Sequence, residues 1–495
     1  MESCTNKLKH MTKHLFFLLL PFFCFSQSKD LHHNLFQSYD SYKEASLEIR
    51  RFKHSDIQPL LDSLKKEKDF EVTLLGKSIQ GRNISMVSVG KGDINVLLWS
   101  QMHGDEPTAT AAMFDMFNYL KTDQRLLENL KVHFIPMLNP DGATSFSRRN
   151  AIGIDINRDA VALQSPESQI LKHARDSLQA RFGFNLHDQS KYYNVKKSDK
   201  PATISFLAPA FNYEKDINEI RGNAMRIIAK MNQIVQGYAR GQVGRYNDEF
   251  EPRAFGDNMQ KWGTSTILIE SGGFLDDPEK QFIRKLNYVM VLSALQIIST
   301  EAYKNMTLDQ YLSIPKNDQK LFDLKIENLT FSYLGMDFKV DLGIHHLEKE
   351  NKDHSAFYYL GKISDIGDLS THYGYKTLDA EALTFKSGET YPKILEDFEA
   401  FKNLDFESLL RQGYTSVSIN NMPEEVKFTS YPMNIVNLEK IQIPKNNAMP
   451  KSPVALGSEA TFLLKRDDKV LYAVINGFVY SLQDNKNEVR NGIVK

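Results

Sequence analysis

Four side chains in three separate segments have the types and spacing of a metal-dependent hydrolytic site. His103 and Glu106 lie in a His-Gly-Asp-Glu sequence, His187 lies in a later Asn-Leu-His-Asp sequence, and Glu270 ends the run Thr-Ile-Leu-Ile-Glu. Two imidazoles and a carboxylate make an open zinc site that activates water, and a further carboxylate can accept and return a proton. We therefore expect His103, Glu106 and His187 to bind one Zn²⁺ per chain, with Glu270 as general base and acid.

Each of these residues also has an ordinary structural explanation. His-x-x-Glu is a common tetrapeptide pattern, and His187 could be a buried histidine that is hydrogen-bonded to the backbone. The context favours the metal site, because the pair follows the apolar run 96–99 and because Gly104 and Pro107 favour a turn over a continuing helix. Glu270 is harder to explain as structural, since a carboxylate beside an apolar run is costly to bury unless it is paired or lies in a polar cleft.

The elements that must position these residues alternate, from about residue 71 to residue 300, between short β-like runs and longer helical patterns. This alternation predicts an α/β fold, which we expect to be a mixed, largely parallel sheet with helices on both faces. His103, His187 and Glu270 would each follow the carboxyl end of a strand, where open α/β sheets place their ligands. The predicted strands are residues 71–75, 84–89, 94–99, 131–137, 184–186 and 266–269. The predicted helices are residues 108–120, 166–181, 216–237 and 278–299.

Beyond residue 300 the pattern changes to the alternation of β-strands. Its clearest signal is the segment 470–482, in which Asn476-Gly477 supplies the positive φ angles of a type I′ hairpin turn. We therefore predict a catalytic domain at residues 27–302 and a β-rich C-terminal region at residues 303–495, built as one or two small modules. The sequence does not indicate what this region does. Its histidines lack the spacing of metal ligands, so we expect surface or structural roles for them: His345, His346, His354 and His372.

The first 26 residues carry basic, apolar and polar zones in the order of a secretory signal peptide. The apolar run 15–25 is too short to span a bilayer, and no other run approaches roughly 20 apolar residues. Both cysteines, Cys4 and Cys24, lie in this segment, so the mature chain would fold without disulfides. We predict export to a bacterial periplasm or to the medium.

Composition limits the classes of partner. The chain has 495 residues, which is too long for one ordinary domain. Hydrophobic residues make up 41% of it, which is enough for packed cores. Its formal net charge is −1, so nothing indicates nucleic acid or an anionic membrane as a partner.

These residues together resemble the M14 zinc metallocarboxypeptidases over about residues 65–300. Six motifs follow the order of that family: residues 76–82 (Gly-Lys-Ser-Ile-Gln-Gly-Arg), the His103 and Glu106 pair, residues 139–142 (Asn-Pro-Asp-Gly), residues 148–158, His187 and Glu270. Six motifs in order are far more specific than His-x-x-Glu alone.

The resemblance assigns roles to further polar residues. Arg148 would be the cation beside the scissile carbonyl, with Arg149 as the alternative occupant of that role. Asn157 and Arg158 would hold the carboxylate of the substrate, a task that suits the planar guanidinium of Arg158. The remaining candidates are Asp155, which would orient His103, and Tyr246, which would cap the substrate. Without the metal motifs, these arginines would read as a solvated loop with surface ion pairs.

Three functions are consistent with the sequence. The first is a secreted zinc carboxypeptidase that acts on a peptide or peptide-like substrate with a free carboxylate. The second is a zinc amidohydrolase that acts on a non-standard amide, such as a peptidoglycan stem peptide or an N-acyl amino acid. The third is a non-catalytic binding protein on the same fold. The complete ligand set together with Glu270 argues against the third.

Overall fold

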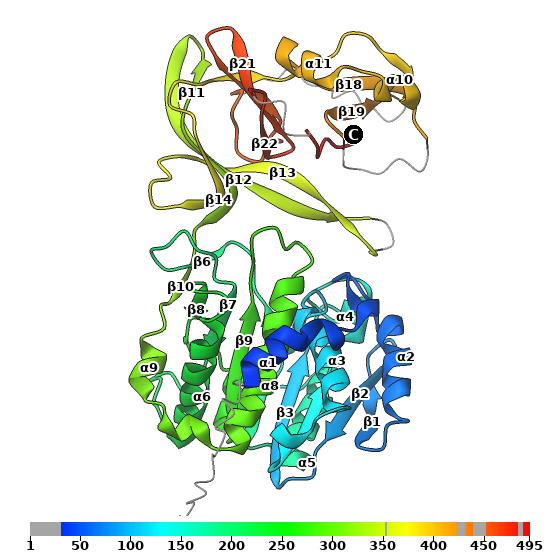
Figure 1. The fold of residues 1–495 in the computed structure, drawn as a ribbon, viewed down its shortest axis with the longest axis vertical. Helices are drawn as coiled ribbons and strands as arrows, with labels where there is room; N and C mark the ends of the chain where they lie inside the picture. Colours follow the sequence, from blue (N-terminus) through cyan, green and yellow to red (C-terminus); the bar gives the residue numbers. More distant parts are fainter. Residues whose placement is uncertain (1–30, 352–353, 424–430, 439–451, 484–488) are drawn as a thin grey trace, which may run out of the picture.

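The computed structural model describes residues 31–351, 354–423, 431–438, 452–483 and 489–495. They form two bodies stacked along the long axis of the molecule, an α/β body below and a β-rich body above (Figure 1). The predicted signal peptide, residues 1–26, lies outside the described residues. Within the ranges given above, no helix combines the length and the apolar character needed to cross a membrane.

The α/β body is built on an eight-stranded sheet in the order β1-β2-β4-β3-β5-β9-β7-β8. The four neighbours β4, β3, β5 and β9 run parallel, while the pairs β1–β2, β2–β4 and β7–β9 are antiparallel. The predicted mixed, largely parallel sheet is therefore confirmed. Its strands are β1 (Phe70–Lys77), β2 (Asn83–Val89), β3 (Ile94–Ser100), β4 (Leu130–Ile135), β5 (Phe182–Asp188), β7 (Ile204–Leu207), β8 (Val243–Arg245) and β9 (Ser265–Ser271).

Helices cover both faces of this sheet, as β3 shows. Val96 and Leu98 belong to the core cluster that includes α3, α6 and α8, whereas Leu97 and Trp99 belong to the cluster that includes α5 and α7. Alternate side chains of a strand point to opposite faces, so the apolar run in β3 fills both cores. The helices of the body are α1 (Leu31–Ser38), α2 (His54–Leu64), α3 (Thr108–Leu120), α4 (Pro140–Thr144), α5 (Pro166–Leu178), α6 (Glu219–Val235), α7 (Phe255–Lys261) and α8 (Gln281–Ser299).

The long elements match the sequence prediction. Helix α3 begins and ends at the predicted residues, and the ends of α5, α6 and α8 fall within three residues of the predicted ends. The sequence analysis did not predict strands β7 and β8 or helix α7, because segments of three to seven residues carry too little periodicity.

The β-rich body contains two sheets. The larger has the order β13-β12-β11-β15-β20-β21-β22, with β14 paired to β11, and the smaller has the order β16-β18-β17, with β19 paired to β18. The turn between β21 and β22 has φ angles of 51° at Asn476 and 84° at Gly477, which confirms the predicted hairpin. The elements are β11 (Leu321–Tyr333), β12 (Met336–Glu350), β13 (Phe357–Gly367), β14 (Tyr373–Asp379), β15 (Thr384–Ser387), β16 (Glu389–Thr390), β17 (Leu395–Asp397), α10 (Phe398–Lys402), α11 (Phe406–Gln412), β18 (Tyr414–Asn421), β19 (Asn434–Asn437), β20 (Phe462–Arg466), β21 (Lys469–Ile475) and β22 (Phe478–Ser481).

The chain that follows α8 packs on the α/β body before it enters the β-rich body. Helix α9 (Leu308–Leu312) places the hydroxyl of Tyr311 3.1 Å from the backbone nitrogen of Ala208, and β10 (Asn317–Gln319) pairs with β6 (Tyr193–Val195). The domain boundary that we predicted at residues 302 and 303 stays a prediction.

Candidate metal centre

The turn after β3 aims His103 and Glu106 at the same point. Gln101 has a positive φ of 51°, and its side-chain amide donates to the carbonyl of Gly104 at 2.9 Å. A Cβ atom at Gly104 would lie 2.0 Å from the backbone carbon of Gly142, so a side chain at position 104 would separate the two loops. A Cβ atom at Gly142 would lie 2.4 Å from the side-chain amide of Asn139 and 2.7 Å from the carbonyl oxygen of Ser147, so this position also requires glycine.

The turn that begins at Asn139 holds the neighbouring loops together. The side-chain oxygen of Asn139 accepts from the backbone nitrogen of Gly142 at 2.9 Å. The side-chain amide of Asn139 donates to the carbonyls of Met102 at 3.3 Å and Arg148 at 3.5 Å. The upstream motif supports this turn, because Ser78 donates to Asp141 at 2.8 Å. Asn139 therefore links the loop that carries His103 and Glu106 to the loop that carries Arg148.

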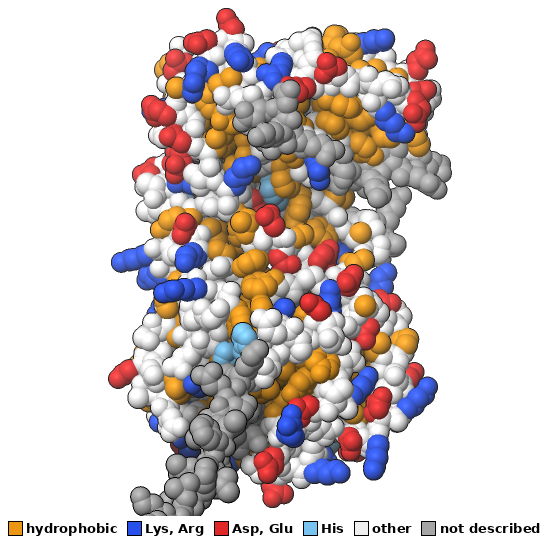
Figure 2. All heavy atoms as spheres, viewed as in Figure 1, with side chains coloured by type: hydrophobic (Ala, Val, Ile, Leu, Met, Phe, Trp, Pro, Cys, Tyr) orange, Lys and Arg blue, Asp and Glu red, His pale blue; other side chains and the backbone are white. Residues whose placement is uncertain are grey.

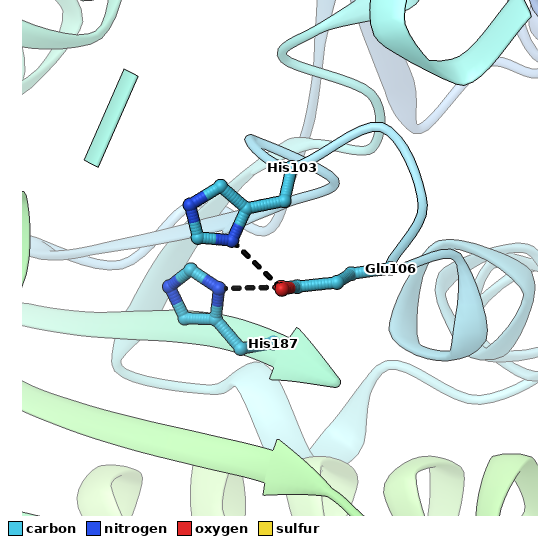
Figure 3. A group of neighbouring side chains, drawn as sticks. All are labelled: His103, Glu106 and His187. Atoms are coloured by element: carbon cyan, nitrogen blue, oxygen red, sulfur yellow. Dashed lines mark hydrogen bonds and ion pairs between the residues drawn. The ribbon is translucent and has the colours of Figure 1, made fainter. Parts of the chain in front are cut away.

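His103, Glu106 and His187 form a buried triad at the carboxyl end of the sheet (Figure 3). Nδ1 of His103 lies 2.8 Å from Oε1 of Glu106, and Nδ1 of His187 lies 2.7 Å from Oε2 of the same carboxylate. One candidate ligand atom from each residue lies within 4.8 Å of the others, and no residue of the triad is more than 8% exposed. Burial opposes the ionisation of Glu106, but the two imidazoles keep its pKa well below the usual range. Two imidazole nitrogens that converge on one ionised carboxylate fit the ligand set of a zinc ion.

Asp155 supports the triad from the side opposite the carboxylate. Its Oδ1 lies 3.1 Å from Nε2 of His103, so Nδ1 of the same ring is directed toward Glu106. Arg148 extends this network, because its guanidinium lies 3.0 Å from Asp155 and 3.4 Å from Glu106 while its side chain remains 43% exposed. Arg148 therefore places an accessible positive charge at the edge of the triad.

Glu270 lies on the strand next to the third candidate ligand. Strands β5 and β9 are parallel, and His187 and Glu270 are partners in their register. Burial, reinforced by the negative charge of Glu106, raises the pKa of Glu270 well above its ordinary value. The structure thus brings Glu270 to the triad, as the sequence predicted.

The other predicted substrate-binding residues differ in the partners that their side chains contact. The side-chain oxygen of Asn157 accepts from the backbone nitrogen of Phe255 at 2.9 Å, and Nε of Arg158 lies 3.4 Å from Glu251. Arg149 is exposed and donates to the carbonyl of Gly153 at 2.9 Å. Its guanidinium is thus held in its own loop, in contrast to that of Arg148.

Tyr246 lies close enough to Glu270 for the charge of that carboxylate to affect its pKa. Its hydroxyl lies 3.3 Å from the hydroxyl of Tyr193, and burial followed by the negative charge of Glu270 raises its pKa. Tyr193 was not predicted. Its position in β6, six residues after His187, was the only available signal.

Two further carboxylates at the site were also missed. Asp188 accepts from the hydroxyl of Thr108 at 2.6 Å and lies 3.2 Å from the ammonium of Lys280, and burial raises its pKa. Asp105 is also buried enough for its pKa to rise to about 6. Both residues directly neighbour a predicted ligand, which is the signal that could have identified them.

A buried His-Glu-His triad at the carboxyl edge of a mixed α/β sheet, with a separate glutamate beside it, has the donor set of a candidate metal-dependent hydrolase. Residues 57–170 match the zinc carboxypeptidase family, Peptidase M14. The M14 resemblance predicted from the motifs is thereby confirmed over these residues.

Individual relatives are distant. Carboxypeptidase SOL1 of Arabidopsis thaliana is 28% identical over 175 residues, which cover 28% of this chain and 35% of that protein. Carboxypeptidase 2 of Trichophyton tonsurans is 26% identical over 143 residues, which cover 28% of this chain and 26% of that protein. The chain thus spans about a third of the length of the curated relatives it matches. Among solved structures, a metallo-carboxypeptidase from Burkholderia cenocepacia aligns with a TM-score of 0.42 at 15% identity, covering 51% of this chain and 70% of that one.

Proposed function

We propose that this protein is a zinc-dependent carboxypeptidase that removes residues from the carboxyl termini of peptides. The convergence of the Nδ1 atoms of His103 and His187 on Glu106, at 2.8 Å and 2.7 Å, carries this proposal. A zinc ion held by these three residues would act as a Lewis acid and lower the pKa of a water molecule. The matches to the M14 family and to distant carboxypeptidases support the same reaction class.

Glu270 and Arg148 are our candidates for the groups that act on the reacting atoms. Glu270 lies beside His187 in the register of the sheet and would accept a proton from the attacking water and deliver it to the leaving amine. Arg148 keeps an exposed guanidinium next to Glu106, where it would stabilise negative charge that develops on the carbonyl oxygen.

Recognition of the free carboxylate is assigned to Asn157 and Arg158. The oxygen of the Asn157 side chain is already engaged by Phe255, so its amide group would donate to the substrate. The guanidinium of Arg158 is paired with Glu251 at 3.4 Å on a half-exposed surface, so a substrate carboxylate would replace or share that partner. We assign no role in binding to Arg149.

The test measures zinc content and hydrolysis of a mixed peptide library by the purified protein and by its Glu270→Gln variant. We expect one zinc per chain in both proteins, with loss of carboxyl-terminal residues only in the unchanged protein. A decrease in rate of about 100- to 10,000-fold is the ordinary contribution of a general base. Replacement of the exposed Arg149 by Gln is the matched control and should retain most of the activity.

Each contrary outcome changes a different part of the proposal. Zinc bound without any trimming of peptides would favour the amidohydrolase alternative. No zinc after reconstitution would contradict the assignment of the triad.

Export is a further proposal, because the predicted signal peptide lies outside the described residues. It rests on the order of the basic, apolar and polar zones in residues 1–26. Sequencing the amino terminus of the protein recovered from its host tests it, since an unprocessed terminus in the cytoplasm would contradict export.

A further inference from the structure

A large cavity lies between the two bodies and reaches the metal centre. It has a volume of about 1010 Å³. One wall comes from the α/β body and includes Glu106, Asp188 and the loop of residues 272–278, while the opposite wall comes from the β-rich body and includes Leu347 and Phe478. Ligand pockets occupy roughly 300–1,000 Å³, and sites between domains are common, so this cavity has the size of a binding site. Because Glu106 lines it, the cavity is continuous with the candidate active site.

Both walls of the cavity include exposed apolar side chains. Leu275 in the loop after β9 is 55% exposed and Leu347 in β12 is 41% exposed, and both line the cavity. Phe478 stacks on His346 with ring centroids 3.9 Å apart, which adds an aromatic surface to the same wall. Figure 2 shows hydrophobic side chains gathered at the waist between the two bodies. Large apolar groups exposed on facing walls indicate a ligand with apolar groups.

Several cations of the lining are already neutralised. Arg50 lies 2.7 Å from Glu348, Lys191 lies 2.6 Å from Asp323, and Lys280 lies 3.2 Å from Asp188. A ligand that relied on these groups for an anionic contact would have to break an existing ion pair. The charges therefore favour an uncharged apolar segment over a phosphate or a second carboxylate.

The positions of Arg148 and Arg158 set the direction in which a substrate would lie. Arg148, Asn157 and Arg158 are not among the described residues that line the cavity, whereas Glu106 is. Glu106 also lies 3.4 Å from Arg148, so this carboxylate connects the guanidinium of Arg148 with the cavity. A substrate with its terminal carboxylate at Arg158 would lead from there past the triad and into the cavity.

We propose that this cavity binds the part of the substrate on the amino side of the scissile bond, and that its β-rich wall selects apolar or aromatic side chains there. This inference rests on the proposed carboxypeptidase function. It gives the β-rich body a role in specificity, with Leu347 and Phe478 on one side of the bound chain and Leu275 on the other.

The test compares three peptides that share the same last two residues. One is a short acetylated dipeptide, one carries a Leu- and Phe-rich extension, and one carries a Ser- and Gly-rich extension of equal length. For the unchanged protein, we expect kcat/KM to be at least about 10-fold higher for the apolar extension than for the polar one. In Leu347→Asp and in Leu275→Asp, the ratio of kcat/KM for the apolar-extended peptide to that for the short peptide should fall about 10-fold.

Leu334→Asp is the matched control. Leu334 is 71% exposed in the turn between β11 and β12, has a φ of 52°, and does not line the cavity among the described residues. Aspartate tolerates this backbone conformation, so the control should fold normally and keep the wild-type ratio. Melting temperatures of all three variants identify any that fold poorly, and two substitutions on opposite walls keep the test independent of either one.

A binding measurement separates this inference from the proposed function. In the Glu270→Gln background, fluorescence anisotropy of the labelled apolar-extended peptide should show a Kd about 10-fold weaker when Leu347→Asp is added. Equal affinity for the apolar and polar extensions, or no effect of either substitution, would overturn the cavity proposal even if the enzyme is active. Peptide binding that responds to the substitutions in a protein that cleaves no peptide would count against the carboxypeptidase proposal alone.

Discussion

Replacing Asp155 by Asn should weaken zinc binding without removing a ligand. Asp155 lies 3.1 Å from Nε2 of His103, accepts from the backbone nitrogen of Asn157 at 3.0 Å, and pairs with Arg148 at 3.0 Å. Asparagine preserves the volume and can still accept from Asn157. It removes the negative charge that orients the imidazole and holds the guanidinium.

The size of the effect follows from that contact. A hydrogen bond between charged groups contributes about 1.5–3 kcal/mol. Loss of such a partner behind a metal ligand raises the zinc Kd about 10- to 100-fold, or about 1.4–2.7 kcal/mol, so the two figures agree. Competition against a chromophoric chelator of known affinity measures the change directly.

Asp115→Asn is the matched control for this experiment. Asp115 is also buried and lies 2.5 Å from the guanidinium of Arg284, but its other partners are Tyr39 and the backbone of Glu44 instead of a metal ligand. We expect it to lower stability while it leaves the zinc Kd within about 2-fold, as for independent sites. Unchanged zinc affinity in Asp155→Asn would refute the assigned role of Asp155. An equal loss in the control would attribute the effect to general destabilisation.

Three further outcomes follow from the structure. Asp115→Asn should lower the free energy of unfolding by about 3–5 kcal/mol, because it leaves the buried guanidinium of Arg284 without its anion; an unchanged thermal midpoint would contradict this. Burial raises the pKa of Asp257 from 3.8 to about 7, so the folded chain holds a proton that the unfolded chain releases, and stability should fall as the pH rises between these values. Asp257→Asn should remove this contribution, which melting temperatures across that pH range would reveal. Removing zinc with a chelator should lower the melting temperature reversibly, because an ion that binds only the folded state stabilises it, and identical melting curves with and without zinc would argue against the site.

The clustering of the His-Glu-His triad with Glu270 could be predicted because these residues stand at or near the carboxyl ends of apolar strands. The runs that became β3, β5 and β9 are buried on both faces, so their ends were readable, and His103, His187 and Glu270 stand at or just beyond them. The positions of Arg148 and Asp155 came from the resemblance to M14 motifs, since a loop of charged residues has no period that fixes its geometry. Their contacts with the triad are visible only in the folded chain.

The relation between the two bodies could not be predicted. It depends on pairs such as Arg50 with Glu348 and Lys191 with Asp323, which are separated by more than 100 residues in sequence and belong to no periodic pattern. The pairing of the short strands β6 and β10 could not be predicted either, because neither segment indicates this contact alone. The cavity is a product of this docking, and so its walls were absent from the sequence prediction.

The pairing of β6 with β10 has a consequence for the order in which the chain matures. Strand β6 begins six residues after His187, and Lys191 between them is held by Asp323 at 2.6 Å. These partners emerge from the ribosome more than 100 residues after the third candidate ligand has been synthesised. A nascent chain therefore lacks the contacts that fix the loop beyond His187, and we expect this loop to reach its final position only after residue 323 has been synthesised.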